Sequence, residues 1–327
     1  MTAKIGVIRI HQTGGPEVLQ WEEVAVPPPG PGEVTLQQEA VGLNFVDIYV
    51  RTGLYPAPLP SGLGQEGAGV VTAVGEGVTD LRVGDRVAYA GGPLGAYAEV
   101  RNMPAQHLVR LPDGISTELA AAMLLRGLTA QYLLRRTYRV QSGDPVLIHS
   151  AAGGVGMIAA QWAKALGAHV IGTVGSAGKA ELARSHGCDE VIILGQENLP
   201  ERVKALTGGE GVAVAYDAVG KDTFFDSLDS IRPLGMMVSF GNASGPVPPI
   251  SVLELSKRGS LFLTRPSLFA YTRKRGDLLA MAEELFDVIK TGKVKIEVGQ
   301  SYALQEAGRA QTDLAERRTT GCTVLLP

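Results

Sequence analysis

The sequence predicts an α/β protein in which a doubly wound parallel (Rossmann) sheet is inserted into a β-rich domain. Between residues 145 and about 264, strand-like and helix-like segments alternate, and this alternation indicates a parallel sheet. Residues 4–110 contain short alternating apolar runs separated by clusters of Pro and Gly, a pattern typical of a barrel-like β domain. At 327 residues the chain is long enough for about two domains with separate cores.

The expected elements follow one another along the chain. A helix is expected over residues 116–139, which begin with Ser116 and Glu118 and are rich in Ala and Leu. The expected strands of the parallel sheet are 146–149, 169–174, 190–194, 212–217, 235–240 and 260–264. The expected helices between them are 155–166, 178–186, 199–206 and 222–230. A further amphipathic helix is expected over 277–291, and a last short strand from Cys322 to Leu326.

The segment between the first strand of this sheet and the next helix has the spacing of a dinucleotide-binding fingerprint. Small residues stand at Ala151, Gly153 and Gly156, with Ala151 in the place of the first glycine, and Gly154 and Val155 lie between the last two. The chain must turn sharply out of the strand, a pyrophosphate must approach the backbone, and the helix must pack closely on the strand. The diphosphate would lie at the free N–H groups of the helix N-terminus. The segment predicts a nucleotide-binding βαβ unit, with a structural tight turn as the alternative.

The order of the elements then predicts the domain organisation. The first part of the β-rich domain is expected over residues 1–127, and the nucleotide-binding domain over 128–265. Residues 266–327 are expected to return to the first domain.

The end of the second strand of the parallel sheet predicts which dinucleotide binds. NAD sites usually place an Asp or Glu about 20 residues after the motif, where it binds the ribose 2′-hydroxyl. Here the segment from Val174 to Lys179 has no acidic residue and offers the Ser176 hydroxyl and the Lys179 cation. These groups suit a 2′-phosphate, so the sequence favours NADPH over NADH. The alternative is that Ser176 caps the next helix and Lys179 is an ordinary surface lysine.

Charge and cysteine usage argue against several other classes of function. The net charge is −3, so no basic field favours a nucleic-acid or anionic-membrane partner. No run of about 18 apolar residues is present, and the N-terminus lacks the cleavage pattern of a signal peptide. Cys188 and Cys322 are the only cysteines, and neither they nor the five histidines have the spacing of metal ligands, so no metal is expected. A reducing cytoplasm is the expected location.

Motifs along nearly the whole chain carry a family resemblance. The segments are Asn44-Phe45-Val46-Asp47, Arg51 to Pro56, Gly64 to Gly69, Gly84-Asp85-Arg86-Val87, Ala151 to Gly156, Tyr216 to Gly220, Ser239-Phe240-Gly241-Asn242 and Thr264-Arg265-Pro266-Ser267. Together they resemble the zeta-crystallin-like NADPH:quinone reductases, the zinc-free branch of the medium-chain dehydrogenase/reductase superfamily. The resemblance implies a Rossmann domain inserted into a GroES-like catalytic domain.

The chain departs from the zinc alcohol dehydrogenases at the metal ligands. Asn44 stands where those enzymes carry a cysteine, Gln65 stands where they carry a histidine, and neither side chain is a good zinc ligand. The structural-zinc lobe, with its four cysteines, is missing after Val100. Without a Lewis acid, alcohol oxidation loses its main source of transition-state stabilisation, whereas a quinone or another activated acceptor needs less of this help.

The resemblance implies four residues around the nicotinamide and the acceptor, namely Asn44, Tyr49, Tyr55 and Arg265. Tyr and Arg donors would stabilise the negative charge that develops on a carbonyl oxygen as hydride arrives. Alternatively, Tyr49 and Tyr55 are half-buried aromatic residues of a β-rich domain, and Arg265 forms an ion pair at a domain boundary.

Five further residues are implied along the cofactor. They are Thr129 near the diphosphate, Leu194 beside the adenine, Phe240 and Asn242 along the nicotinamide, and Arg317 at the 2′-phosphate. Leu194 stands where the family often has a tyrosine, which leaves apolar contact with the ring but removes a hydroxyl. Arg318 is adjacent to Arg317, so either arginine could face the phosphate, and both could instead belong to a solvated basic turn.

Three functions remain open at this point. The first is NADPH-dependent reduction of quinones, the second is reduction of an activated C=C bond in an enal, enone or enoyl thioester, and the third is non-catalytic binding of NADPH. The resemblance also implies a homodimer in which the apolar edge strand Ser260–Thr264 pairs with its copy. The alternative is a monomer in which the helix over 277–291 covers this edge.

Overall fold

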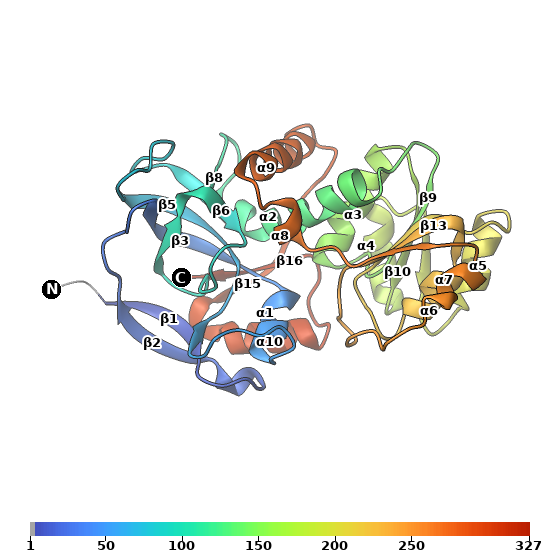
Figure 1. Ribbon diagram of the computed structural model, residues 1–327, viewed down its shortest axis with the longest axis horizontal. Helices are drawn as coiled ribbons and strands as arrows, with labels where there is room; N and C mark the ends of the chain where they lie inside the picture. Colours follow the sequence, from blue (N-terminus) through green and yellow to red (C-terminus); the bar gives the residue numbers. More distant parts are fainter. Residues whose placement is uncertain (1–3) are drawn as a thin grey trace. The chain divides into compact units, whose positions relative to one another are not determined.

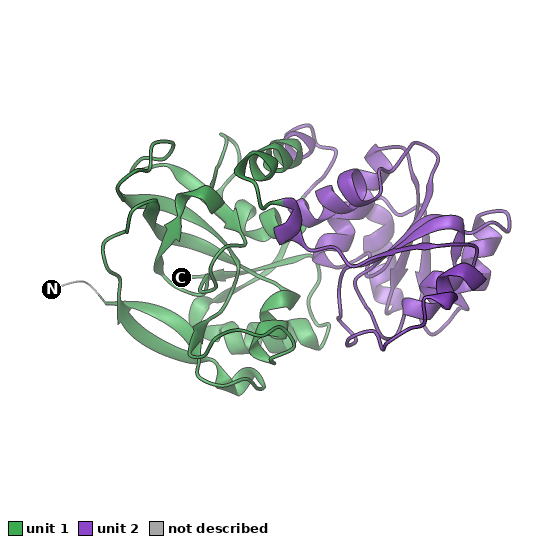
Figure 2. Cartoon of the chain, viewed as in Figure 1, with its two compact units in different colours: residues 1–126, 272–286, 296–327 green, residues 127–271, 287–295 purple. Residues whose placement is uncertain are grey.

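The computed structural model describes residues 4–327, and the chain divides into two compact units (Figures 1 and 2). Unit 1 comprises residues 1–126, 272–286 and 296–327, and unit 2 comprises residues 127–271 and 287–295. The chain thus leaves the first unit at Arg126 and returns to it after the parallel sheet is complete.

Unit 1 is built on two sheets. The larger one has seven strands in the order β15-β16-β3-β5-β6-β8, with β7 pairing with β3, and the smaller one has the order β2-β1-β4. The C-terminal strand β16 pairs antiparallel with β3, so the returning segment completes the larger sheet. The strands are β1 (Lys4–Ile10), β2 (Gln20–Ala25), β3 (Glu33–Leu43), β4 (Ser61–Gly62), β5 (Glu66–Val74), β6 (Arg86–Ala90), β7 (Val100–Pro104), β8 (Val109–Arg110), β15 (Val298–Ala303) and β16 (Cys322–Leu326).

Alternation along the strands of unit 1 produces its core. In the first half of β3 the side chains of Val34 and Leu36 are buried whereas those of Thr35 and Gln37 are partly or fully exposed, as expected for a half-buried antiparallel strand. Helices α1 (Phe45–Arg51) and α10 (Ala307–Ala315) belong to this unit, whereas α2 (Thr117–Tyr132) and α9 (Arg275–Lys290) cross its boundaries. Its short helical turns are η1 (Pro16–Val18), η2 (Ala105–His107) and η5 (Leu304–Glu306).

Unit 2 is a six-stranded parallel sheet in the order β11-β10-β9-β12-β13-β14. In chain order this is 3-2-1-4-5-6, the order of a Rossmann sheet. All six side chains of β12 are buried, because helices cover both faces of such a sheet. The strands are β9 (Pro145–Ile148), β10 (His169–Val174), β11 (Glu190–Ile193), β12 (Val212–Asp217), β13 (Ile231–Ser239) and β14 (Phe262–Thr264). The helical segments are η3 (Leu133–Thr137), α3 (Gly154–Ala165), η4 (Ala177–Lys179), α4 (Ala180–Ser185), α5 (Leu199–Leu206), α6 (Phe224–Asp229), α7 (Leu253–Lys257) and α8 (Leu268–Tyr271).

The structure confirms the predicted fold class, a parallel Rossmann sheet together with a separate β-rich unit. The ends of several helices and strands differ from those expected. The helix expected over 116–139 changes to a π-helical turn at Leu133. The last strand of the parallel sheet, expected over 260–264, begins only at Phe262. Ser260 has φ +59°, and the N–H of Leu261 donates to Leu255 O, so these two residues cannot join the ladder. No helix within residues 4–327 combines the length and the apolar character that a membrane crossing needs.

Candidate active site

The predicted dinucleotide fingerprint forms the loop between β9 and α3. Ser150 begins it with φ +55°, a left-handed conformation that few non-glycine residues adopt, and the N–H of Ala151 donates to Thr173 O at 2.9 Å. Gly153 is the N-cap of α3, so Gly154, Val155 and Gly156 form its first turn. The structure thus brings all five residues of the predicted fingerprint into one strand–turn–helix.

Gly156 shows that this loop requires small residues. A Cβ at this position would lie 2.2 Å from the Ser150 carbonyl oxygen and 2.9 Å from Ala151 Cα, both of them backbone atoms. The first turn of α3 contains no acidic residue, and its free N–H groups carry the positive end of the helix dipole. The loop therefore fits the diphosphate of a dinucleotide.

The residues expected at the adenosine end follow β10 and β11. Ser176 is the exposed N-cap residue of η4, and the half-buried Lys179 ends that turn. The N–H of Leu194 donates to Val174 O at 2.9 Å, so the ends of β10 and β11 are held together. This end of unit 2 therefore presents a hydroxyl, a cation and an apolar side chain, the three groups expected around a phosphorylated adenosine.

Two of the residues expected at the nicotinamide contact each other in unit 2. With its amide oriented to satisfy both ends, Asn242 donates to Gly241 O at 2.9 Å and accepts from the Arg265 guanidinium at 3.2 Å. Phe240 begins the same loop, where its N–H donates to Asp217 O at 2.8 Å. Thr129 is buried on the part of α2 that belongs to unit 2.

In unit 1, Asn44 is the centre of a buried polar network. It is the N-cap of α1, its N–H donates to Asp47 Oδ2 at 2.9 Å, and its Nδ2 donates to Glu66 Oε2 at 2.7 Å. Glu66 also accepts the N–H of Leu125 at 2.7 Å and pairs with Arg126 at 3.5 Å. Burial raises the pKa of Glu66, and the Arg126 charge and these hydrogen bonds act against that rise. Sequence reasoning missed Arg126, for which an arginine within an Ala- and Leu-rich helix was the only signal.

Tyr49 and Tyr55 form an aromatic pair beside this network. Their ring centroids lie 5.2 Å apart with an edge-to-face angle of 64°, and the N–H of Tyr55 donates to Tyr49 O at 2.9 Å. Both side chains are half-buried, so each ring packs on protein while the pair reaches the surface of the unit. Unit 1 thus presents an amide and two phenols from one short helix and the loop that follows it.

The residues of unit 1 do not fit a catalytic zinc ion. The amide of Asn44 is committed to Glu66, Gln65 Oε1 is buried with no hydrogen-bond partner, and carboxamides are poor zinc ligands. Among residues 4–327, no group of three or more His, Cys, Asp or Glu side chains is placed to hold a metal ion.

We therefore expect zinc-independent activity. Purified protein should carry less than stoichiometric zinc by elemental analysis, and a chelator should leave kcat unchanged. A stoichiometric zinc ion that is lost together with activity on chelation would contradict this assignment.

Asp47 gives unit 1 an unusual pH dependence. Its carboxyl group is fully buried, only Oδ2 receives donors (the Asn44 N–H and the Tyr97 hydroxyl), and Oδ1 has no partner. Burial therefore raises its pKa from 3.8 to about 7, although the two hydrogen bonds act to lower it. Between these values the folded chain keeps a proton that the unfolded chain releases, so rising pH destabilises the fold.

Asp47→Asn should remove this dependence while retaining an oxygen acceptor. From pH 4 to pH 7, the free energy of unfolding of the parent relative to the variant should fall by up to about 1.4 kcal/mol per pH unit and then level off. Trp21 lies in unit 1 and Trp162 in unit 2, so Trp162→Phe in both proteins leaves a fluorophore in unit 1 only. A difference that stays constant with pH would show that Asp47 is ionised in the folded state.

The two adjacent arginines near the C-terminus have different surroundings. Arg318 pairs with Asp313 at 2.6 Å and with Glu316 at 2.7 Å. Arg317 has φ +61° and an exposed side chain. Two carboxylates therefore hold the Arg318 guanidinium within unit 1.

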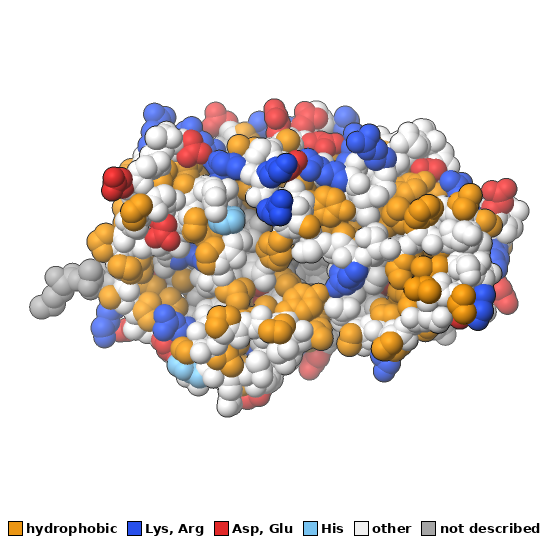
Figure 3. Space-filling model, in the orientation of Figure 1, with side chains coloured by type: hydrophobic (Ala, Val, Ile, Leu, Met, Phe, Trp, Pro, Cys, Tyr) orange, Lys and Arg blue, Asp and Glu red, His pale blue; other side chains and the backbone are white. Residues whose placement is uncertain are grey.

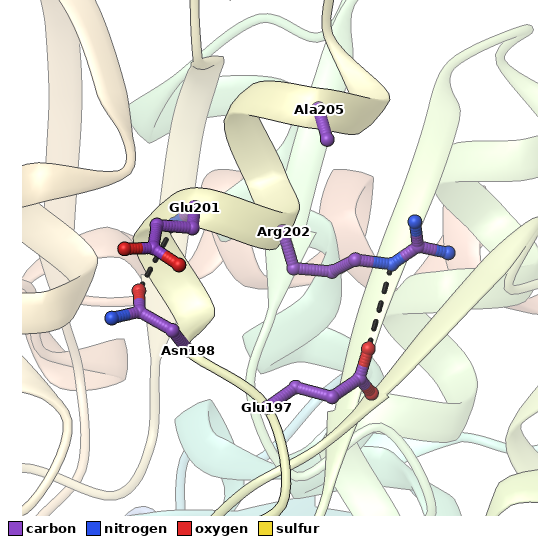
Figure 4. A pocket seen from close by; sticks show the side chains of 5 residues that line it. All are labelled: Glu197, Asn198, Glu201, Arg202 and Ala205. Atoms are coloured by element: carbon purple, nitrogen blue, oxygen red, sulfur yellow. Dashed lines mark hydrogen bonds and ion pairs between the residues drawn. The ribbon is translucent and has the colours of Figure 1, made fainter.

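One surface hollow in unit 2 carries no comparable chemistry (Figure 4). It is a shallow, open hollow of about 370 Å³, lined by Glu197, Asn198, Glu201, Arg202 and Ala205. Its polar groups are used locally, since Asn198 accepts the N–H of Glu201 at 3.1 Å and Arg202 pairs with Glu197 at 3.5 Å. The hollow is the capped beginning of α5.

Comparisons with known proteins agree with this geometry. The family model described as alcohol dehydrogenase GroES-like domain matches residues 30–113, and the one described as zinc-binding dehydrogenase matches residues 154–286. A quinone oxidoreductase of Pseudomonas aeruginosa is 57% identical over 321 residues, which cover 98% of this chain and 99% of that one. A 2-haloacrylate reductase of Burkholderia is 47% identical over 326 residues, covering 97% and 98% of the two chains.

A solved structure gives the same result. Escherichia coli quinone oxidoreductase, crystallised in complex with NADPH, superposes with a TM-score of 0.97 at 49% identity and covers 98% of this chain and 100% of its own. A parallel sheet with a glycine-rich loop after its first strand, together with a GroES-like unit, is the architecture of the medium-chain dehydrogenases/reductases. Within that superfamily, the chain belongs to the zinc-free quinone oxidoreductases.

Proposed function

We propose that this protein reduces quinones with NADPH. The observation that carries the proposal is that one chain combines a glycine-rich loop that fits a diphosphate, in unit 2, with a buried amide and two neighbouring phenols in unit 1. The relatives named quinone oxidoreductase, one of them crystallised with NADPH, support it over nearly the full length of the chain.

The cofactor side follows from the groups in unit 2. The N–H groups of Gly154, Val155 and Gly156, beside Ala151 and Gly153, would bind the diphosphate, with Thr129 contributing a hydroxyl. Ser176 and Lys179 would bind the 2′-phosphate, where the family resemblance also implies Arg317, and the adenine would pack on Leu194. Phe240 and Asn242 would line the nicotinamide. Bound NADPH supplies a hydride, which leaves NADP⁺.

On the acceptor side, the family resemblance implies Asn44, Tyr49 and Tyr55 of unit 1 and Arg265 of unit 2. A quinone that takes up one hydride and one proton becomes a hydroquinone, and negative charge develops on its oxygens during the transfer. Phenol and guanidinium donors stabilise that charge and orient the ring. The Asn44 amide, held by Glu66 at 2.7 Å, is fixed in position by a buried partner.

A panel of acceptors tests this assignment. With purified protein and NADPH, kcat/KM for 1,4-benzoquinone and naphthoquinones should exceed that for 2-chloroacrylate, an enal and an enone. The relative named 2-haloacrylate reductase makes reduction of an activated C=C bond the second candidate. A higher kcat/KM for 2-chloroacrylate or the enal than for any quinone would replace the first candidate by the second.

The choice of cofactor depends on Lys179. NADPH should bind much more tightly than NADH, and Lys179→Ala should remove a charge-assisted contact of about 1.5–3 kcal/mol, which corresponds to a rise in the NADPH Kd of about 10- to 100-fold. NADH binding should hardly change. Lys204→Ala, on the exposed face of α5, is the control. Equal affinity of the parent protein for the two cofactors would refute the assignment.

We also propose a homodimer that pairs two β14 strands. Phe262 and Leu263 are 58% and 38% exposed on this three-residue strand at the edge of the parallel sheet. Hydrophobic side chains gather on the face of unit 2 drawn in Figure 3, and Val252 and Leu253 are 77% and 61% exposed. Pairing of the two edges would satisfy their backbone groups.

Phe262→Lys should shift the sedimentation mass from dimer to monomer, because it places a charge in the proposed seam. Leu261 is unsuitable for this test, since it is 6% exposed and packs in the core of unit 2. Val83→Lys, at a 63% exposed position of unit 1, is the matched control. A parent protein that sediments as a monomer at micromolar concentration would reject the dimer.

A cytoplasmic location is part of the same proposal. Both cysteines are buried free thiols, as expected in a reducing compartment. Fractionation of the native cells, with the protein found outside the soluble cytoplasmic fraction, would contradict it.

A further inference from the structure

Asp217 is a fully buried carboxylate at the end of β12. Its Oδ1 accepts the N–H groups of Val219 and Gly220 at 2.7 and 2.9 Å. Its Oδ2 accepts the hydroxyl of Thr223 at 2.8 Å and that of Ser227 at 3.3 Å. Three donors, together with the Ser227 hydroxyl that Asp217 shares with Thr223 O at 2.8 Å, surround a carboxylate, which only accepts hydrogen bonds.

The backbone of the same residue holds a second loop. Asp217 O accepts the N–H groups of Phe240 and Gly241 at 2.8 and 3.2 Å. This loop follows β13 and carries Asn242, so one residue fixes both the turn after β12 and the loop proposed to line the nicotinamide. Both loops lie at the carboxyl ends of parallel strands, the edge at which ligands bind to such sheets.

His149 extends the connection toward the glycine-rich loop. It is fully buried, with Nε2 at 2.8 Å from Ser227 Oγ and Nδ1 at 2.9 Å from Thr173 Oγ1. Burial lowers its pKa, which favours the neutral ring. The Ser227 hydroxyl has two acceptors, Thr223 O at 2.8 Å and Asp217 Oδ2 at 3.3 Å, so its proton points away from the ring. The ring therefore donates from Nε2, and Nδ1 accepts the proton of Thr173.

Thr173 completes the connection through its main chain. Its carbonyl oxygen accepts the N–H of Ala151 at 2.9 Å, at the start of the glycine-rich loop. An unbroken series of hydrogen bonds therefore joins the proposed diphosphate loop to the proposed nicotinamide loop through the interior of unit 2. Its side-chain members lie on the strands β10 and β12, in the turn after β9 and on the helix α6, so it depends on the tertiary fold.

We propose that Asp217 is a positioning residue for the cofactor. Through Ser227 and His149 it fixes the nicotinamide loop relative to the diphosphate loop, and thereby sets where the reactive carbon of the nicotinamide lies. This inference rests on the proposed function. The link matters because a misplacement of about 1 Å costs a transfer reaction about a hundredfold in rate.

Two serines on α6 and at its end give a matched test. Ser227 and Ser230 are both fully buried, but the Ser230 hydroxyl donates only to Asp226 O, at 2.6 Å. Ser227→Ala should raise the NADPH Kd about tenfold and lower kcat at saturating NADPH, with the quinone KM unchanged. Ser230→Ala should lower the melting temperature to a similar extent and leave the NADPH Kd unchanged. Equal effects of the two changes on the NADPH Kd would overturn the inference.

Thr173 supplies a second test that keeps the core packed. Thr173→Val retains the side-chain volume and loses the hydroxyl, whereas Thr173→Ser retains the hydroxyl. The valine variant should show the weakened NADPH binding and reduced kcat, and the serine variant should restore both. Asp217→Asn should have the largest effect of the series. Parental NADPH affinity in folded Asp217→Asn, or failure of serine to restore what valine loses, would overturn the inference.

The NADPH Kd is measured by cofactor fluorescence without any acceptor, which separates two possible failures. Parent protein that binds NADPH but reduces no quinone contradicts the proposed function, while the variant series still tests the network by its effect on binding. Active parent protein whose variants keep both NADPH Kd and kcat contradicts only the role of Asp217.

Discussion

Gly156→Ala should weaken NADPH binding at least a hundredfold while leaving unit 1 folded. The new Cβ would lie 2.2 Å from the Ser150 carbonyl oxygen, and its three nearest atoms all belong to the backbone of Ser150 and Ala151, so no flexible side chain can move aside. The start of α3 must therefore move away from the loop by about an ångström to restore van der Waals distance. That movement displaces the N–H groups that would bind the diphosphate, so titration of NADPH fluorescence should show at least a hundredfold weaker binding, about 2.7 kcal/mol.

Substitutions of two other glycines serve as controls for this prediction. A Cβ at Gly153 would lie 3.2 Å from Ser150 O, so Gly153→Ala should have an intermediate effect. A Cβ at Gly276, near the start of α9, would meet nothing within 4 Å, so Gly276→Ala should bind NADPH as the parent does. NADPH binding by Gly156→Ala at the parental affinity would show that the cofactor lies elsewhere.

Arg126→Met should destabilise unit 1 by about 3–5 kcal/mol, because it leaves Glu66 as an uncompensated buried charge. The two side chains are 7% and 0% exposed and lie 3.5 Å apart, and Arg126 Nη1 also donates to Ala122 O at 2.7 Å. With Trp162 replaced by Phe, chemical unfolding followed through Trp21 measures the change in unit 1. Loss of the Arg126 charge should also disturb Asn44, since both residues contact the same Glu66 oxygen.

A control at a surface ion pair and a double variant show whether the unpaired charge of Glu66 causes the loss of stability. Arg82 is 84% exposed and pairs with Asp85 at 3.5 Å, so Arg82→Met should cost no more than about 1 kcal/mol. Glu66→Gln combined with Arg126→Met removes both charges and should recover part of the lost stability. If the two methionine variants are equally stable, the buried pair does not stabilise unit 1.

The sequence was sufficient to predict the fold where local pattern determines structure. Apolar runs of β-branched residues between helical segments marked the strands of unit 2, and β10 and β12 begin and end at the predicted residues. Ends that depend on distant contacts were less accurate. β13 begins at Ile231 and not at residue 235, since Val212 pairs with Ile231 before the register shifts.

The candidate site was also predictable from the sequence only where its residues are neighbours in the chain. The fingerprint from Ala151 to Gly156 is a local pattern in which spacing alone indicates the turn. The network of Asp217 is not local, because His149 and Ser227 are 78 residues apart, and no local pattern links them. Glu66 and Arg126 are 60 residues apart, so no local pattern links them either.

Single-turnover reduction of a quinone tests the central proposal most directly. Protein saturated with NADPH is mixed with one equivalent of 1,4-benzoquinone, and NADPH absorbance and hydroquinone formation are followed in a stopped-flow instrument. We expect one NADPH to be oxidised for each hydroquinone formed, at a rate far above that of the same mixture without protein and independent of added chelator. NADPH that stays bound and unoxidised in the presence of quinone would contradict the account and leave a cofactor-binding protein without reductase activity.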